Sequence, residues 1–190
     1  PEKLAWGILW TAFAVFCVLV VVVPWGVRSF FLNATESQLA SVEALVGTVV
    51  VQIPGNPTAK PVVSGQRIEV PEGTVIIVDE TADAAVTFFD HSVMRLFRDT
   101  SVSLEEMRVA RFSFSDQPGR IRLYANGGLL GLGRTLLQDL PLKFEIGFLQ
   151  GNVDLAEDGS YRIEVSNDRS EIVVTRGGAA SQPIALGDRT

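Results

Sequence analysis

Residues Leu4–Val27, LAWGILWTAFAVFCVLVVVVPWGV, form a run without a charged side chain, with Glu2 and Lys3 before it and Arg28 after it. This run is longer than the ~20 residues that an α-helix needs to cross the ~30 Å hydrocarbon core of a bilayer. Its tryptophans lie near its ends, where amphipathic rings prefer the headgroup level. They are Trp6, Trp10 and Trp25. The run predicts a membrane anchor over residues 1–28.

A cleaved signal peptide is the alternative interpretation of this run. The apolar core of a signal peptide is usually ~7–15 residues long, and no small-x-small cleavage site follows directly here. A retained transmembrane helix is therefore preferred. Pro24 and Gly26 predict that this helix ends or kinks near them. Gly7, Thr11 and Ala14 lie near one helical face, where small side chains would let neighbouring membrane helices approach closely.

Composition limits what the rest of the chain can be. Beyond the anchor and a stalk over residues 29–41, about 150 residues remain, which is the size of one ordinary domain. The formal net charge of −6 argues against nucleic acid as a partner, because Lys and Arg supply most of that affinity. The only cysteine, Cys17, lies in the apolar run, so no intramolecular disulfide is expected.

Orientation in the membrane depends on weak signals. Lys3 and Arg28 nearly cancel under the positive-inside rule. Because almost nothing precedes the anchor, we expect the N-terminus in the cytoplasm and the large domain outside it, in the periplasm or at the cell surface.

Residues 42–190 carry short apolar segments rich in Val, Ile, Phe and Thr, separated by turn residues every ~8–12 positions. This pattern predicts a single all-β domain, either a β-sandwich or a short β-solenoid-like stack. VARFSFS (109–115) is expected as a strand and Asn126–Gly128 as a turn, while SQLASVEALV (37–46) is expected to contain one helical turn. Alternation predicts these inward side chains: Val49, Val51, Ile76, Val86, Phe88, Leu123, Ile163, Val165 and Val173.

Several segments taken together resemble a known family. They are Val46–Val49, Ser64–Ile68, Ala85–Ser92 with Leu96, Ser101–Leu104, Gly159–Val165, Ile172–Val174, Gly177–Gly178 and Ile184–Gly187. The set, over roughly Val46 to Asp188, looks like the FecR-type extracytoplasmic domain, and the resemblance implies a membrane-anchored β-domain outside the cytoplasm.

Two departures from the family pattern stand out. Asp90-His91-Ser92 stands where the family usually has Asp-Gly-Ser, which places a non-glycine residue where a positive φ is wanted. FecR-type regulators also carry a cytoplasmic segment before the anchor that engages a sigma factor, whereas only Pro1, Glu2 and Lys3 precede the run here. The resemblance thus extends to the domain and not to the signalling segment.

The residues offer little for catalysis. The chain has one histidine, and we expect no catalytic residues, no metal site and no cofactor. His91 beside Asp90 is interpreted as a solvated turn histidine rather than a pH switch. Gly127–Arg134 lacks the glycine spacing and the lysine of a phosphate loop. We expect it to be an apolar edge or loop that contacts a partner through Leu129, Leu130 and Leu132.

Positive charge gathers in one third of the chain, at Arg108, Arg111, Arg120, Arg122 and Arg134. Three interpretations of these arginines remain open. The arginines pair with carboxylates on the solvated faces of strands, or face lipid phosphates or an acidic subunit, or bind nucleic acid. The first is preferred, and the net charge weighs most against the third. Arg120, Arg122 and Arg134 are kept as candidate partner contacts.

The leading hypothesis is a non-enzymatic single-pass membrane protein whose FecR-like domain makes protein–protein contacts, as an accessory subunit of a larger membrane complex. The alternative is a FecR-like signal transducer, which a longer N-terminal extension in the gene would favour. A third possibility is a module that binds envelope glycan or peptide. Other membrane subunits are the expected partners, and a small-molecule ligand is not expected.

Overall fold

The structure is a computed structural model. It describes residues 2–56, 58–112, 115, 117–134, 142–149, 151–155, 159–166, 170–176 and 179–185. The chain divides into two compact units, and each is described by itself. The helical unit contains residues 1–35 and 110–117, and the β unit contains residues 36–109 and 118–190.

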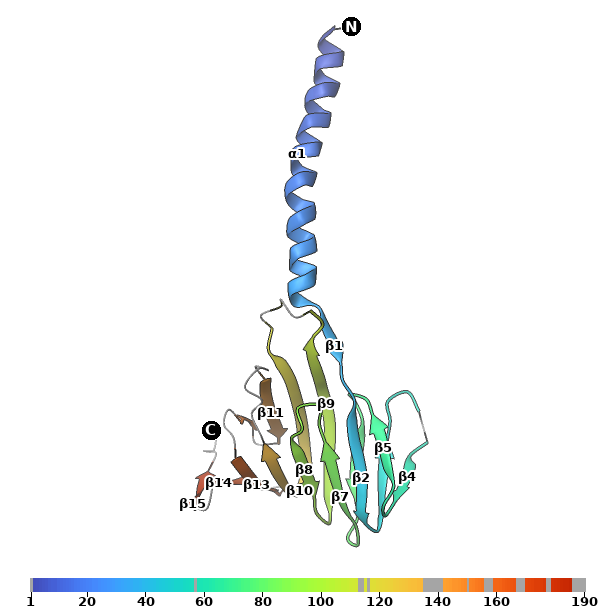
Figure 1. Ribbon diagram of the computed structural model, residues 1–190, viewed down its shortest axis with the longest axis vertical. Coiled ribbons are helices and arrows are strands. Elements are labelled where there is room, and N and C mark those ends of the chain that lie inside the picture. Colours follow the sequence, from blue (N-terminus) through green and yellow to red (C-terminus); the bar gives the residue numbers. More distant parts are fainter. Residues whose placement is uncertain are drawn as a thin grey trace. The chain divides into compact units, whose positions relative to one another are not determined.

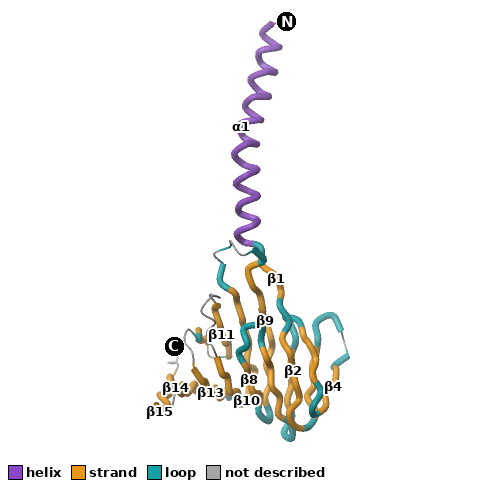
Figure 2. Tube along the Cα trace, viewed as in Figure 1, coloured by secondary structure: helices purple, strands orange, loops and turns teal. Residues whose placement is uncertain are grey.

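The helical unit is built on α1 (Glu2–Asn33), drawn in blue in Figure 1 and in purple in Figure 2. Pro24 lies inside this helix, so the expectation of an end or kink near Pro24 and Gly26 is wrong as to the end. A proline removes one hydrogen-bond donor but leaves the flanking turns intact, and apolar helices tolerate this loss. The stretch Leu9–Asn33 is long and apolar enough to cross a bilayer, and none of its 18-residue apolar window is buried.

The β unit confirms the all-β prediction. Its strands are β1 (Thr35–Ser37), β2 (Ala40–Val46), β3 (Thr48–Gln52), β4 (Lys60–Val63), β5 (Arg67–Val70), β6 (Val75–Val78), β7 (Asp83–Thr87), β8 (Val93–Leu96), β9 (Thr100–Ala110), β10 (Gly119–Arg134), β11 (Leu142–Phe148), β12 (Gly151–Asp154), β13 (Gly159–Val165), β14 (Ser170–Arg176) and β15 (Ala179–Ala185). They form a nearly closed sheet whose main path runs β4-β3-β6-β9-β10-β8-β7-β2-β5. Figure 2 shows these strands in orange, joined by short teal loops.

Strand β10 joins the two halves of this sheet. Its first half, from Gly119, pairs with β9 and β11, and its second half, from Gly128, pairs with β8 and β13. The expected turn at Asn126–Gly128 is therefore wrong, because the strand bends there and continues. Gly128 has a φ of 101°, and a Cβ at this position would lie 2.6 Å from the carbonyl oxygen of Asp99. Glycine thus permits a change of sheet without a reversal of the chain.

The two halves of the sheet enclose one apolar core. All of the side chains predicted to point inward are buried except Val173, which is half-buried while its neighbour Ile172 is buried. That alternation is one residue out of register with the expectation. The rings of Phe88 and Phe144 meet edge to face at 5.5 Å. Most strand pairs are antiparallel, as between β3 and β6, which favours the sandwich over a solenoid of parallel coils.

Two further expectations about local structure are corrected. The segment expected to form a helical turn is strand β2, because Ala40, Val42 and Ala44 alternate into the core between β5 and β7. The strand expected over residues 109–115 ends at Ala110, since the chain there leaves the sheet for the helical unit. The pair Gly177–Gly178 and the family-like ending at residues 186–188 lie outside the described residues.

Candidate functional site

The connection between β9 and β10 holds the C-terminal end of the helix. The backbone N–H of Arg111 donates to the carbonyl of Ala34 at 3.0 Å, and the hydroxyl of Ser115 donates to the carbonyl of Leu32. The last carbonyls of an α-helix have no partner within the helix, so groups from elsewhere must satisfy them. Here the β-hairpin supplies two of those donors.

Side chains extend this contact. The amide Nε2 of Gln117 donates to Oδ1 of Asn33 at 3.1 Å, and the rings of Phe31 and Phe112 pack edge to face at 4.8 Å. We call the set Phe31–Ala34, Arg111, Phe112, Ser115 and Gln117 the clamp. All of its residues belong to the helical unit.

Aromatic rings and one guanidinium lie in and next to the clamp. Phe30 packs against Phe31 at 5.8 Å and is 64% exposed, and the guanidinium carbon of Arg111 lies 5.9 Å from the Phe112 ring centre. Trp25, five residues before Phe30 in the helix, is 74% exposed. Aromatic and cationic groups therefore gather at the end of an apolar helix, the composition typical of a membrane interface.

The predicted anchor residues all lie on exposed positions of α1. Trp6, Trp10 and Ala14 are exposed, and no atom lies within 4 Å of a Cβ built on Gly7. The hydroxyl of Thr11 donates to the Gly7 carbonyl at 2.8 Å, which satisfies that polar group within the helix. Packing of this face on other membrane helices stays a prediction.

The apolar contact surface expected at residues 127–134 is wrong in its central part. Leu130 and Leu132 are each only 1% exposed, and Leu129 is half-buried. They belong to β10, where Leu130 pairs with Leu96 of β8 on one side and with Ile163 of β13 on the other. Leu130 and Leu132 lie on the face of β10 that points into the apolar core, so these leucines serve the core.

The predicted arginines fall into different environments. Arg134 is buried, so it is not available as a partner contact; its guanidinium donates to the carbonyl of Leu142 at 3.0 Å and lies 5.9 Å from the Phe144 ring centre. Arg120 is exposed on the outer face of β10. Arg122 lies 3.4 Å from the carboxylate of Glu145 on the neighbouring strand, as expected for a solvated strand pair.

Glu145 is the centre of a polar network on the outer face of β10, β11 and β12. Oε1 accepts a 2.6 Å hydrogen bond from Asn152, and Oε2 lies 3.7 Å from the ammonium of Lys143. The Asn152 hydrogen bond lowers the pKa of Glu145, and the charges of Arg122 and Lys143 add to that effect against the cost of burial. The positive charges here face carboxylates and are not gathered for a phosphate backbone.

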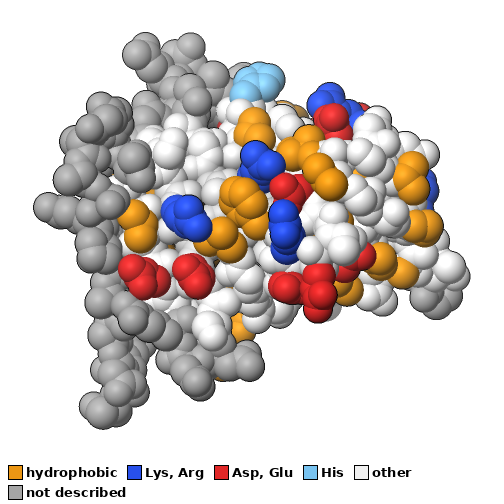
Figure 3. Space-filling view, turned by 90° about the horizontal axis from the view of Figure 1, so that it is seen from below, with side chains coloured by type: hydrophobic (Ala, Val, Ile, Leu, Met, Phe, Trp, Pro, Cys, Tyr) orange, Lys and Arg blue, Asp and Glu red, His pale blue; other side chains and the backbone are white. Residues whose placement is uncertain are grey.

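Arg108 and Glu72 form a second pair of this kind. The guanidinium donates to both carboxylate oxygens, at 2.8 and 3.1 Å, and these hydrogen bonds are the main cause of the lowered pKa of Glu72. The preferred reading of the arginines holds for Arg108 and Arg122. Figure 3 shows the same mixture on another face, where basic and acidic side chains alternate with separate apolar ones.

The turn at Asp90-His91-Ser92 adopts the backbone that its sequence predicts. His91 has a φ of 63°, in the left-handed region that histidine tolerates better than most non-glycine residues. Asp90 is buried and accepts hydrogen bonds from the backbone N–H of Ser92 at 3.1 Å and from its hydroxyl at 2.6 Å. His91 itself is exposed, in keeping with a structural turn.

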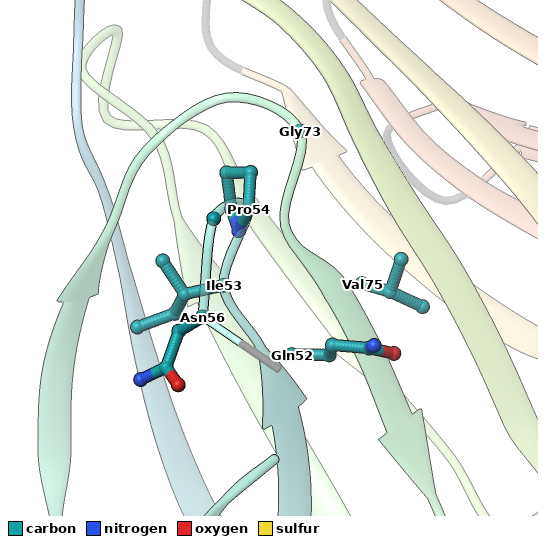
Figure 4. A pocket seen from close by; sticks show the side chains of 7 residues that line it. Gln52, Ile53, Pro54, Asn56, Gly73 and Val75 are labelled. Atoms are coloured by element: carbon teal, nitrogen blue, oxygen red, sulfur yellow. The ribbon is translucent and has the colours of Figure 1, made fainter. Parts of the chain in front are cut away.

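A hollow of about 490 Å³ lies beside the end of β3. Figure 4 shows its lining side chains, with Gln52 extending toward Val75, Pro54 beside Gly73, and Ile53 and Asn56 pointing away from Val75. None of the residues that line it is titratable. Within the described residues, no three His, Cys, Asp or Glu side chains are grouped to hold a metal ion.

Comparison of the chain with protein-family models, curated proteins and solved structures finds no match. The resemblance to the FecR-type domain therefore stays a prediction drawn from the sequence.

The clamp is the arrangement that the sequence did not reveal. Phe112, Ser115 and Gln117 lie some 80 positions from their partners in α1, for example 83 positions for Ser115 and Leu32. One local signal was present, since Arg111 and Phe112 break the alternation of β9 just before a proline-containing turn. That signal indicates where the strand ends but not what the turn contacts.

Proposed function

We propose that this chain is a non-enzymatic, single-pass membrane protein whose β unit makes protein–protein contacts outside the cytoplasm as an accessory subunit of a larger membrane complex. The N-terminus lies on the cytoplasmic side in this proposal. The bilayer and other membrane subunits are its partners, and its interior holds no cofactor.

The observation that carries the proposal is that the connection between β9 and β10 holds the C-terminal end of an apolar helix. The chain passes between the two units three times, near residues 35, 109 and 117, rather than once through a stalk. A flexible tether would leave the helix end free, whereas here hydrogen bonds from Arg111 and Ser115 hold it. A helix end held in this way suits an anchor that keeps a fixed place in an assembly.

In this proposal, packing of α1 against other membrane helices is the first contribution to the free energy of association. In lipid, helices gain no hydrophobic drive toward one another, so close approach depends on small side chains. Gly7, Thr11 and Ala14 offer such a face, and the Thr11 hydroxyl is already satisfied within the helix.

Co-purification of the detergent-solubilised protein, followed by mass spectrometry, tests the proposal. Gly7→Leu with Ala14→Leu should reduce recovery of membrane partners, because bulky side chains separate the helices. Ala12→Leu is the matched control, since Ala12 is exposed but lies about 140° around the helix from Gly7. Undiminished recovery from the double variant would contradict the helix-packing part of the proposal.

A second arm tests the β unit. Leu130→Asp does not suit this purpose, because Leu130 is buried and its replacement would disturb the core. Val46 and Val63 are 52% and 51% exposed at neighbouring turns, which the backbone N–H of Ser64 ties together through the Gly47 carbonyl. Val46→Asp with Val63→Asp should lower partner recovery and leave the melting temperature nearly unchanged. A cytoplasmic regulator as the main co-purifying protein would instead favour the signal-transducer alternative.

A further inference from the structure

We propose that the clamp is a second membrane contact, in which Arg111 and the aromatic rings beside it bind the headgroup layer of anionic phospholipids. The inference rests on the proposed membrane anchor and adds a lipid-binding surface to it. It assigns a role to the tip of a β-hairpin that is far from the anchor in sequence.

The length of the apolar stretch positions the clamp at the membrane surface. Leu9–Asn33 has 25 residues, which is about 37 Å of helix at ~1.5 Å per residue. The hydrocarbon core is only ~30 Å thick within a total of ~40–45 Å, so the last turns of α1 lie in the headgroup layer. Phe31–Ala34 and the hairpin residues bonded to them therefore share that layer.

The exposed chemistry of this end of the helical unit matches a headgroup layer. Phe30 and Trp25 are 64% and 74% exposed. In a protein surrounded by water, such large apolar side chains would be expected to be buried. Arg28 and Arg111 are both exposed at the same end of the unit. Aromatic rings and arginines together are the residues that anchor proteins at this depth, where guanidinium groups bind lipid phosphates bidentately.

Arg111 differs from Arg108 and Arg122 of the β unit in its surroundings. Arg108 and Arg122 have carboxylate partners at 2.8 and 3.4 Å. Within the part of the chain that the structure describes, the Arg111 guanidinium lies against the Phe112 ring, 5.9 Å from its centre. An arginine held over an aromatic ring keeps its charge available for an external anion, and here the nearest external anions are lipid phosphates.

The geometry also explains why the hairpin tip carries an aromatic residue. Phe112 packs edge to face on Phe31, which itself packs on Phe30, so three rings form a continuous row from the hairpin to the exposed helix surface. Inserted in the headgroup layer, this row removes apolar surface from water. The hairpin thereby helps to hold the C-terminal end of α1 at a fixed depth in the membrane.

Tryptophan quenching by lipids measures the depth of each site in the full chain. Three single-tryptophan chains are reconstituted in vesicles of phosphatidylcholine with phosphatidylglycerol, all other tryptophans being replaced by phenylalanine. One keeps Trp10 in the anchor, one carries Phe112→Trp in the clamp, and one carries Phe97→Trp in the β unit. Phe97 is the matched control because it also has an arginine over its ring, with the Arg95 guanidinium carbon at 5.0 Å.

The expected result separates the three sites. Nitroxides on the lipid headgroup should quench the tryptophan at position 112 several times more strongly than the one at position 97, and acyl-chain nitroxides should quench Trp10. In anionic vesicles, Arg111→Gln should lower about fivefold the ratio of lipid-bound to unbound clamp. One arginine near such a surface contributes ~1 kcal/mol. Arg111→Lys should retain most of the effect, and Arg98→Gln, an exposed arginine of the β unit, should have none.

Two outcomes would overturn the inference and are distinguishable. If Trp10 is quenched while positions 112 and 97 are quenched equally, the clamp does not bind lipid and the anchor stands. If Trp10 itself escapes acyl-chain quenching, the anchor fails and the inference fails with it. Should Phe112→Trp impair folding, Gln117→Trp probes the depth of the same hairpin from another position.

Discussion

Two valine-rich segments of similar composition differ in this molecule: one is an exposed helix and the other is a buried strand. Val20 and Val21 of α1 are 53% and 69% exposed, whereas Ile76 and Val78 of β6 are 0% and 2% exposed. Strand β6 has β3 and β9 on its two sides, while the helix has lipid as its expected surroundings. β-Branched residues favour strands where other strands pair with them, and they form helices where lipid leaves no other hydrogen-bond partner. A high valine content by itself therefore does not decide between helix and strand, and the surroundings of each segment matter as well.

The largest effect on stability is expected when a side chain is removed from the buried face of β6. Removal of a side chain from its exposed face is the comparison. Ile76→Ala leaves a cavity in the core and should lower the free energy of unfolding of the β unit by ~2–5 kcal/mol. The matched variant Ile77→Ala, on the other face at 42% exposure, should change it by less than about 1 kcal/mol. Val20→Ala in α1 should not change it. Chemical denaturation in detergent measures all three, and equal losses for Ile76→Ala and Ile77→Ala would show that the assigned faces are wrong.

The bend in β10 offers a smaller effect. Gly128→Ala places a side chain at a φ of 101° and within 2.6 Å of the Asp99 carbonyl oxygen, so we expect a loss of ~1–3 kcal/mol. Gly127→Ala is the control, because the nearest atom to its Cβ lies 4.0 Å away. Thermal unfolding of the two variants compares them directly. A Gly128→Ala melting temperature no lower than that of Gly127→Ala would mean that the strand does not bend as described.

The smallest expected effect concerns charge on the solvated face. The hydrogen bonds from Arg108 lower the pKa of Glu72 below its usual value of 4.5, so the ionised carboxylate stabilises the fold. That contribution is present above about pH 4.5 and is lost as the pH falls through the lowered pKa of the folded state. Arg108 is 45% exposed, so solvent screening limits the contribution to about 0.5 kcal/mol.

Glu72→Gln should therefore be less stable than the wild type at pH 7, and the difference should shrink as the pH is lowered toward 3. Urea midpoints across this pH range make the comparison. A difference that grows on acidification would contradict the assigned pair.

The sequence predicted those features that follow from local pattern. The uncharged run identified the helix, and alternation of apolar side chains identified most strands and most of the buried residues. The positive φ of His91 followed from its place in a short hairpin turn. Each of these depends on residues close to one another in the chain.

Features that depend on distant neighbours were missed or misassigned. The leucines at 130 and 132 looked like an exposed edge because only the complete fold places their face of β10 against the core. Asn126–Gly128 has the composition of a turn, and only the sheet contacts of β10 make it a bend. The clamp joins residues some 80 positions apart, so no local pattern reports it.

The central claim is that the apolar helix lies in lipid while the β unit lies in water outside the cytoplasm. Cysteine accessibility tests it, with Cys17→Ser removing the native thiol and Thr81→Cys placing a thiol in an exposed turn of the β unit. A membrane-impermeant maleimide added to intact spheroplasts should label the thiol at position 81 and leave Cys17 of the wild-type chain unlabelled. Labelling of position 81 only after lysis, or ready labelling of Cys17 in intact membranes, would contradict the account.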